Sequence, residues 1–180
     1  MEWREPSTIG LAISMLTSGG GEAAANTRDH MRVLGIANSS SALDWACVDG
    51  NNVDDLHVNE RGKVEAPPST RSEQLAWVRR ELLELVDRHR PDRLAVQAAV
   101  KPRGSGSLSV GRVEAQGVLL AAAGESGLDC KLVYGATVRS AFGVAKKQEL
   151  QPAIAQTPAI AAVPKTRREP VIAALCGIVK

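Results

Sequence analysis

The chain has 180 residues, of which 44% are hydrophobic and 23% charged. This composition is ordinary for a soluble globular protein, and the length suffices for one domain with a hydrophobic core. The net charge of +2 by itself indicates no particular partner. No apolar stretch reaches the roughly 18 residues needed to span a membrane, and the acidic Glu2 and Glu5 argue against a signal peptide. We therefore expect no membrane partner.

The three cysteines, Cys47, Cys130 and Cys176, each lie alone in an apolar run. No pair has metal-binding spacing, and the odd number argues against a disulfide framework. Buried, reduced thiols are the expected state, which favours a cytoplasmic location and no cysteine-bound metal.

The first 30 residues differ in character from those that follow. Ser18-Gly19-Gly20-Gly21 interrupts any helix, and residues 22–30 are small and polar. We expect a flexible extension over residues 1–30 and a single domain over residues 31–180. Met31 directly precedes the first apolar run, so a natural start at that residue stays open.

Two strands open the expected domain. Residues 32–36 and 43–48 are apolar runs that predict buried strands. Asp49-Gly50-Asn51 is a turn signal after the second run. Ser39-Ser40-Ser41 lies between the runs and predicts a polar hairpin loop, because no His or Asp base is positioned to make a nucleophile of these serines.

A third strand and a long helix come next. Residues 56–58 and 63–64 predict a short strand near a turn at Asn59-Glu60-Arg61-Gly62. Residues 70–73 have the pattern of a capping box, and apolar residues then recur at helical spacing. The helix is expected to end near His89, which we interpret as a surface residue at the helix end.

The second half alternates strands and helices. Residues 93–97 predict a buried strand. A basic, glycine-rich loop at residues 101–107 follows and lacks the spacing of a phosphate-binding P-loop. The rest predicts helix 110–126, strand 131–134, helix 136–142 and helix 166–179, with the Pro- and Ala-rich residues 148–164 unassigned.

This order predicts an α/β fold with a mixed five-stranded sheet, in which three antiparallel strands precede parallel strands and helices flank the sheet. Such an arrangement is typical of the ribonuclease H-like superfamily. The sugar-kinase and actin-like superfamily shares the opening strands and a polar phosphate loop. It needs a second related domain, however, and 180 residues leave no room for one.

Four segments in order resemble the RuvC family of Holliday junction resolvases. Residues 31–38 resemble the family's opening Gly-Ile-Asp-Pro-Gly, and residues 90–97 resemble a strand that ends in Val-Glu. Residues 114–123 resemble the Gly-Gln-Ala-Arg-Gly helix, and residues 136–143 resemble the short helix before a basic segment. Lys146 and Lys147 then fall where family members carry a lysine.

The resemblance implies two-metal phosphodiester hydrolysis, in which clustered carboxylates hold two Mg²⁺ ions. In the resemblance, Ala37 occupies the family's first acid position and Gln97 the second. Ala37 offers no metal ligand, and Gln97 offers a single neutral oxygen atom. Glu169 is the sole carboxylate in residues 167–175, which are the counterpart of the family's last acids. We therefore expect no bound metal and no Mg²⁺-dependent cleavage by this chain.

Two origins of the substitutions stay open. They could be natural, leaving a scaffold that has lost catalysis, or engineered into an active Mg²⁺-dependent endonuclease. Asp to Ala and Glu to Gln are the changes used to trap a nuclease on its substrate. The weak match at the third acid position favours natural loss. Sequencing codons 37 and 97 of the gene decides between the two origins.

Four other acids are candidate replacement ligands: Asp44, Asp49, Asp54 and Asp55. We interpret them as solvated acids of a strand and a turn.

The first functional hypothesis is binding of nucleic acid, branched DNA in particular, without cleavage. From Lys131 onward eight basic residues accompany two acidic ones, which suits a polyanionic partner and predicts strong salt dependence. The few aromatic residues give little support for base stacking. Candidate DNA contacts are Lys101, Arg103, Arg112, Lys146, Lys147, Arg167 and Arg168.

The second hypothesis is a catalytically inactive subunit in a larger protein complex. The resemblance implies a homodimer. The weakly charged residues 148–164 would suit an interface or an arm that becomes ordered on binding.

Overall fold

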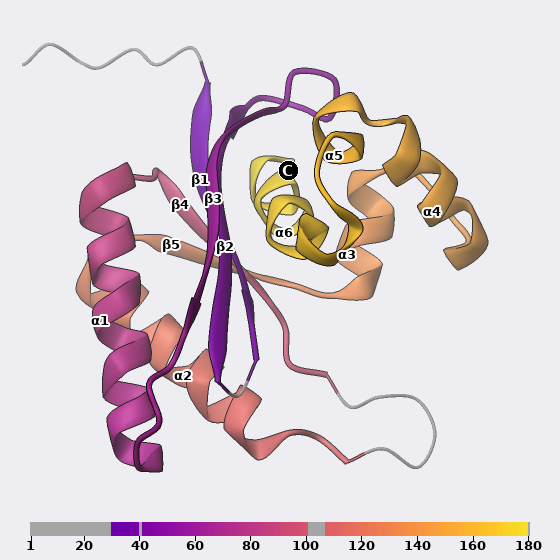
Figure 1. Ribbon diagram of the computed structural model, residues 1–180. Coiled ribbons are helices and arrows are strands. Elements are labelled where there is room, and N and C mark those ends of the chain that lie inside the picture. Colours follow the sequence, from indigo (N-terminus) through magenta and orange to yellow (C-terminus); the bar gives the residue numbers. More distant parts are fainter. Residues whose placement is uncertain (1–29, 40, 101–106, 180) are drawn as a thin grey trace, which may run out of the picture.

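A five-stranded sheet forms the centre of the computed structural model, which describes residues 30–39, 41–100 and 107–179 (Figure 1). The strand order is β3-β2-β1-β4-β5. β1 pairs with β2, and β2 with β3, in antiparallel fashion, whereas β1–β4 and β4–β5 are parallel. The predicted mixed sheet is confirmed. The strands are β1 (Met31–Asn38), β2 (Ala42–Gly50), β3 (His57–Glu65), β4 (Arg93–Gln97) and β5 (Asp129–Val133).

Helices cover both faces of the sheet. One face carries α1 (Arg71–His89) and α2 (Val110–Glu125). The other carries α6 (Arg168–Ile178), with three shorter helices beside it (Figure 1). These are α3 (Gly135–Ala141), α4 (Lys147–Gln156) and α5 (Pro158–Ala161), and a 3₁₀ turn over Lys165–Arg167 leads into α6. The predicted helices agree closely with those of the structure. Residues 148–164, which were left unassigned, contribute most of α4 and all of α5.

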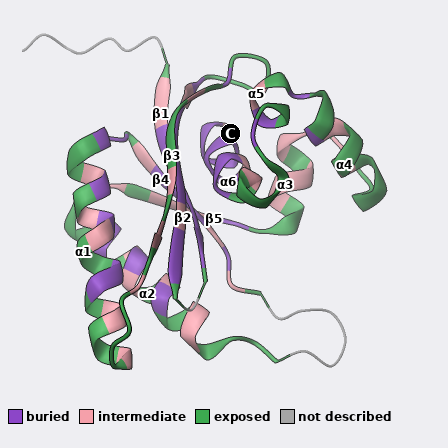
Figure 2. Cartoon of the chain, in the orientation of Figure 1, coloured by how far each residue is buried: buried purple, intermediate pink, exposed green. Residues whose placement is uncertain are grey.

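Side-chain alternation along β1 builds two cores at once. Val33 packs with α6 on one face, whereas Leu34 and Ile36 pack with α1 and α2 on the other. All three side chains are fully buried. Figure 2 shows the central strands and α6 as the most buried part of the molecule. Burial on both faces explains why these strands read as continuous apolar runs.

Two glycines let α6 lie directly against the sheet. A Cβ added to Gly35 on β1 would collide with the carbonyl oxygen of Pro170 and lie 2.6 Å from the backbone nitrogen of Ala174. A Cβ on Gly177 would lie 2.7 Å from a methyl carbon of Val33. Because backbone atoms cannot yield as a flexible side chain can, this close approach fixes the position of α6 relative to β1.

The expected turn at residues 59–62 is wrong, because β3 runs through it without interruption. The pairing with β2 shifts between Cys47 and Val48, which leaves Asn59 as the extra residue of a bulge. Gly62 is a packing position, since a Cβ there would lie 2.8 Å from the indole ring of Trp45. As β3 is an edge strand, its outward residues are polar and resemble a turn in sequence.

The surface interpretation of His89 is also wrong. Its ring packs 5.0 Å from that of Trp45 between centroids, and the residue is only 9% exposed. Its Nε2 has no hydrogen-bond partner and lies 3.8 Å from a carboxylate oxygen of Glu60. Burial lowers the pKa of His89; Glu60 opposes this effect, while Arg88 and Arg32 add to it.

Residues 1–29 lie outside the described part of the chain, so the expected extension stays a prediction. Among the helices described, none is both long and apolar enough to cross a membrane.

Gly35→Ala is expected to lower the free energy of unfolding by about 3 kcal/mol or more, because the new methyl group meets backbone atoms of α6. Gly117→Ala on the exposed surface of α2 is the control, since nothing lies within 4 Å of its added Cβ. That change is expected to be neutral or to stabilise by up to about 1 kcal/mol. Equal urea midpoints for the two variants would contradict the close packing of α6.

His89→Phe is expected to flatten the pH dependence of stability. Since the folded pKa is depressed, the unfolded chain binds a proton that the folded chain excludes as pH falls below about 6.5. The free energy of unfolding then drops by up to about 1.4 kcal/mol per pH unit. Urea unfolding between pH 7 and 5 measures this loss, with His57→Gln on exposed β3 as the control. An unchanged slope in His89→Phe would exclude His89 as its source.

Candidate functional site

The predicted acid positions meet in one hollow at the end of the sheet. Ala37 is the penultimate residue of β1, Gln97 ends the neighbouring parallel strand β4, and Glu169 lies in the first turn of α6. The hollow has a volume of about 330 Å³. Its lining residues are Ala37, Asn38, Ser39, Asp44, Gln97, Ser109, Arg112 and Glu169. Ala37, Gln97 and Glu169, which come from three separate elements, therefore line the same hollow.

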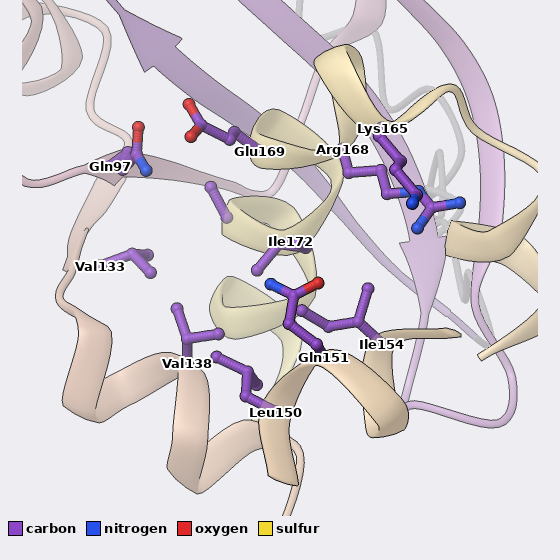
Figure 3. Close-up of a pocket in the computed structure, with 11 residues that line it drawn as sticks. Gln97, Val133, Val138, Leu150, Gln151, Ile154, Lys165, Arg168, Glu169 and Ile172 are labelled. Carbon is purple, nitrogen blue, oxygen red and sulfur yellow. The ribbon is translucent and has the colours of Figure 1, made fainter. Parts of the chain in front are cut away.

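A second hollow of about 400 Å³ adjoins the first and shares Gln97 and Glu169 with it. In Figure 3 these two polar side chains lie at one end of the hollow, above a group of aliphatic side chains. The aliphatic lining consists of Val133, Val138, Leu150, Ile154, Ile172 and Ala173. Lys165 and Arg168 also line this hollow. The hollow therefore combines polar and charged side chains with a group of aliphatic ones.

Arg112 lies inside the first hollow, where its guanidinium meets Gln97. Its Nη2 donates a 2.9 Å hydrogen bond to the Oε1 of Gln97. The Nδ2 of Asn38 donates to the Arg112 carbonyl oxygen at 3.0 Å, which ties the first turn of α2 to the end of β1. Sequence reasoning singled out Arg112 as a DNA contact but did not foresee its contact with Gln97, because that contact depends on how α2 is placed.

Asp44 is a lining residue whose interpretation as a solvated acid is wrong. It is half-buried on β2, directly opposite Ala37 in the antiparallel register. Burial raises the pKa of Asp44, and the nearby charges of Lys63 and Arg167 oppose this effect. Counting outward from the predicted hairpin loop at residues 39–41 would place Leu43 opposite Ala37, one residue away from the observed partner, so the sequence alone does not give this pairing.

The other three aspartates differ from Asp44. Asp49 is half-buried and pairs with Arg32, with 2.8 Å between Oδ1 and Nε. It is therefore not a free turn acid. Asp54 and Asp55 are exposed in the turn after β2, as expected.

The remaining predicted DNA contacts are dispersed around the site. Lys146 and Lys147 are exposed at the start of α4, and Arg167 is exposed beside Asp44 and Lys63. Arg168 is engaged within the protein, because its Nε and Nη2 donate to the carbonyl oxygens of Val163 and Ala161 at 2.8 and 3.0 Å. Lys101, Arg103 and Ser40 lie outside the described residues.

Comparison with known proteins identifies the family. No family model matches the chain. The crossover junction endodeoxyribonuclease RuvC of Acidobacterium capsulatum is 32% identical over 132 residues, which cover 67% of this chain and 76% of that protein. This chain belongs to the RuvC family. The sequence resemblance is therefore confirmed at the level of the family.

Solved structures agree with this assignment. Thermus thermophilus RuvC in complex with a Holliday junction substrate superposes with a TM-score of 0.64 at 25% identity, covering 82% of this chain and 92% of that one. The yeast mitochondrial Holliday junction resolvase Ydc2 superposes with a TM-score of 0.55 at 9% identity, covering 82% and 78% of the two chains. The second likeness supports the fold alone.

The hollow of this RuvC-family chain does not fit the pair of Mg²⁺ ions that the family resemblance implies. Two carboxylates line it, those of Asp44 and Glu169. Ala37 has no ligand atom, and the Gln97 oxygen already accepts a hydrogen bond from the positively charged Arg112. Across the described residues no group of three or more His, Cys, Asp or Glu side chains could hold a metal ion. Divalent cations need more anionic oxygen than this, and a neighbouring guanidinium repels them.

We therefore expect no stoichiometric Mn²⁺ binding by the protein alone. Electron paramagnetic resonance of free Mn²⁺ during a titration measures it directly, and Glu169→Ala is the comparison variant. One or two Mn²⁺ ions bound per chain, and lost in Glu169→Ala, would contradict this description of the site.

Proposed function

We propose that this chain binds branched DNA on a RuvC scaffold and does not cleave it. The observation that carries the proposal is the Gln97–Arg112 hydrogen bond beside Ala37. A methyl group and a neutral amide stand where the family resemblance requires carboxylates, and the Arg112 guanidinium lies beside them. Two-metal hydrolysis depends on anionic ligands for both ions, so this arrangement supports a protein that has lost DNA cleavage. The hollow in which the family's chemistry would take place is still present.

The basic surface near the hollow supports DNA as the partner. Lys146 and Lys147 precede Leu150 and Gln151 on α4, which line the adjoining hollow, and Lys165 lines its wall. Exposed cations around a hollow neutralise phosphates along a nucleic-acid backbone. The solved T. thermophilus RuvC complex contains a Holliday junction substrate, so branched DNA is the first ligand to test.

The surface of α6 supports natural loss of catalysis over engineered inactivation. Four residues of α6, Arg168, Glu169, Ile172 and Ala173, line the adjoining hollow, and Glu169 supplies the one carboxylate among them. Restoring acids at Ala37 and Gln97 alone would leave this helix with an apolar face at the site. Cleavage activity in a variant that carries Ala37→Asp and Gln97→Glu would favour the engineered origin.

A homodimer in the cytoplasm remains part of the proposal, on the strength of the family resemblance. Sedimentation equilibrium of the purified protein tests the dimer, and a monomer at micromolar concentration would remove it from the proposal.

The wild-type protein is expected to shift a four-way junction in a native gel and to leave the DNA intact with Mg²⁺ present. Lys146→Glu with Lys147→Glu should weaken binding and reduce the slope of log affinity against log salt by about 2, since each phosphate contact contributes about 0.9. Arg79→Glu with Arg80→Glu on α1 is the matched control of equal charge change. Equal weakening by both pairs would exclude a specific role for α4. No shift of junction, duplex or single-stranded DNA would favour the assembly-subunit hypothesis.

A further inference from the structure

We propose that Arg112 takes the place of a metal ion as the ligand of a DNA phosphodiester in this hollow. The inference deepens the proposed function and rests on it. A phosphate group bound by carboxylate-held cations in a two-metal nuclease would here be bound by a cation of the chain itself. The site would then be a phosphodiester-binding site that needs no cofactor.

Arg112 forms no ion pair within 4 Å among the residues that the structure describes. Arg32 pairs with Asp49 and Arg93 with Asp129, each at 2.8 Å between nitrogen and oxygen. The described side-chain partner of Arg112, by contrast, is the neutral Gln97. Its Nε is buried without a hydrogen-bond partner. A buried donor on a charged group without an acceptor is costly, and an anion bound beside the guanidinium would offset part of that cost.

The position of Arg112 suits an anion. It lies in the first turn of α2, a helix of 16 residues whose first turn contains no acidic residue. The Ser109 hydroxyl caps this end and lines the same hollow. The partial positive charge of the helix end adds to that of the guanidinium. The Nδ2 of Asn38 donates a 3.0 Å hydrogen bond to the Arg112 carbonyl oxygen, and this bond fixes the backbone that carries the guanidinium.

Gln97 is the residue that leaves this cation available. Its amide oxygen orients Nη2 at 2.9 Å without neutralising the guanidinium. A glutamate at position 97 would form an ion pair with Arg112 and compete with the phosphate. The amide and the arginine therefore act together, with Gln97 as a positioning residue.

The two carboxylates that line the hollow, Asp44 and Glu169, affect how strongly a phosphate would bind there. Asp44 faces Lys63 and Arg167, which offset its charge. Glu169 lines both hollows, and its negative charge opposes a bound phosphate. Removing the charge with Glu169→Gln should therefore strengthen DNA binding in the absence of metal, whereas a residual metal site would be weakened by the same change.

The decisive experiment measures four-way junction binding by fluorescence anisotropy in EDTA over a salt series. Arg112→Gln should weaken binding at least about tenfold and lower the salt slope by about 1, the loss expected for one charge-assisted phosphate contact. Gln97→Glu should weaken binding to a similar degree, but only while Arg112 is present. In a double mutant, Gln97→Glu should add little to Arg112→Gln.

Arg79→Gln is the matched control, because Arg79 pairs with Glu125 at the far end of α2. Glu125 follows Arg112 by 13 residues of one helix, or roughly 20 Å at the helical rise. Thermal unfolding of each variant identifies any change that acts through folding. Wild-type affinity and slope in a folded Arg112→Gln variant would overturn the inference while leaving the proposed function intact.

A second readout separates failure of the proposed function from failure of the inference. Inorganic phosphate is titrated into the wild-type protein while the Arg112 Nε–H resonance is followed by NMR. A saturable shift supports a phosphate site even if no DNA binds, and it would indicate a free phosphate compound as the ligand. No shift together with no junction binding overturns both proposals.

Discussion

The contact between α6 and β1 is the constraint on which the rest of the structure depends. Gly35 removes the side chain that would separate them, so the backbone of α6 rests on the strand. Glu169 in its first turn then reaches the open end of the sheet, beside Ala37 and Gln97. The same contact places Ile172 and Ala173 along the adjoining hollow. Adding a single methyl group at Gly35 would therefore displace α6 and the site residues that it carries.

The chemistry of the site follows from what replaces the expected carboxylates. Clustered acids repel one another and require cations, whereas an alanine and a glutamine remove that requirement. Arg112 can then lie within the hollow, 2.9 Å from Gln97, without forming an ion pair within the described chain. Under the proposal made above, the hollow binds an anion through Arg112 where the family resemblance implies that it binds cations through carboxylates. The family fold is retained because the strands and α6 are held by apolar packing, which is independent of these charges.

Local sequence patterns predicted much of the fold. The helix from residue 71 to 89 and the strand from 93 to 97 were recognisable because apolar spacing and end signals agreed. Edge strand β3 was interrupted in the prediction, since its polar outward residues and Gly62 resemble a turn. His89 was misplaced because its burial depends on Trp45, which comes from a distant strand.

The candidate site was predictable in part for the same reason. Ala37 and Gln97 lie at the carboxyl ends of two strands that local pattern and family resemblance both indicate, so we could expect the two residues to lie close together. Asp44 required the hairpin register, and Arg112 required the docking of α2 against β1. Both are tertiary facts that no local spacing encodes.

Junction affinity with and without divalent metal tests the central claim most directly. The wild-type protein is measured in EDTA and in Mg²⁺ at matched ionic strength, by anisotropy of a labelled four-way junction. Equal affinities, with the junction intact in Mg²⁺, are the predicted result, because the protein supplies its own cation. Binding that requires Mg²⁺, or cleavage that begins when it is added, would contradict the account.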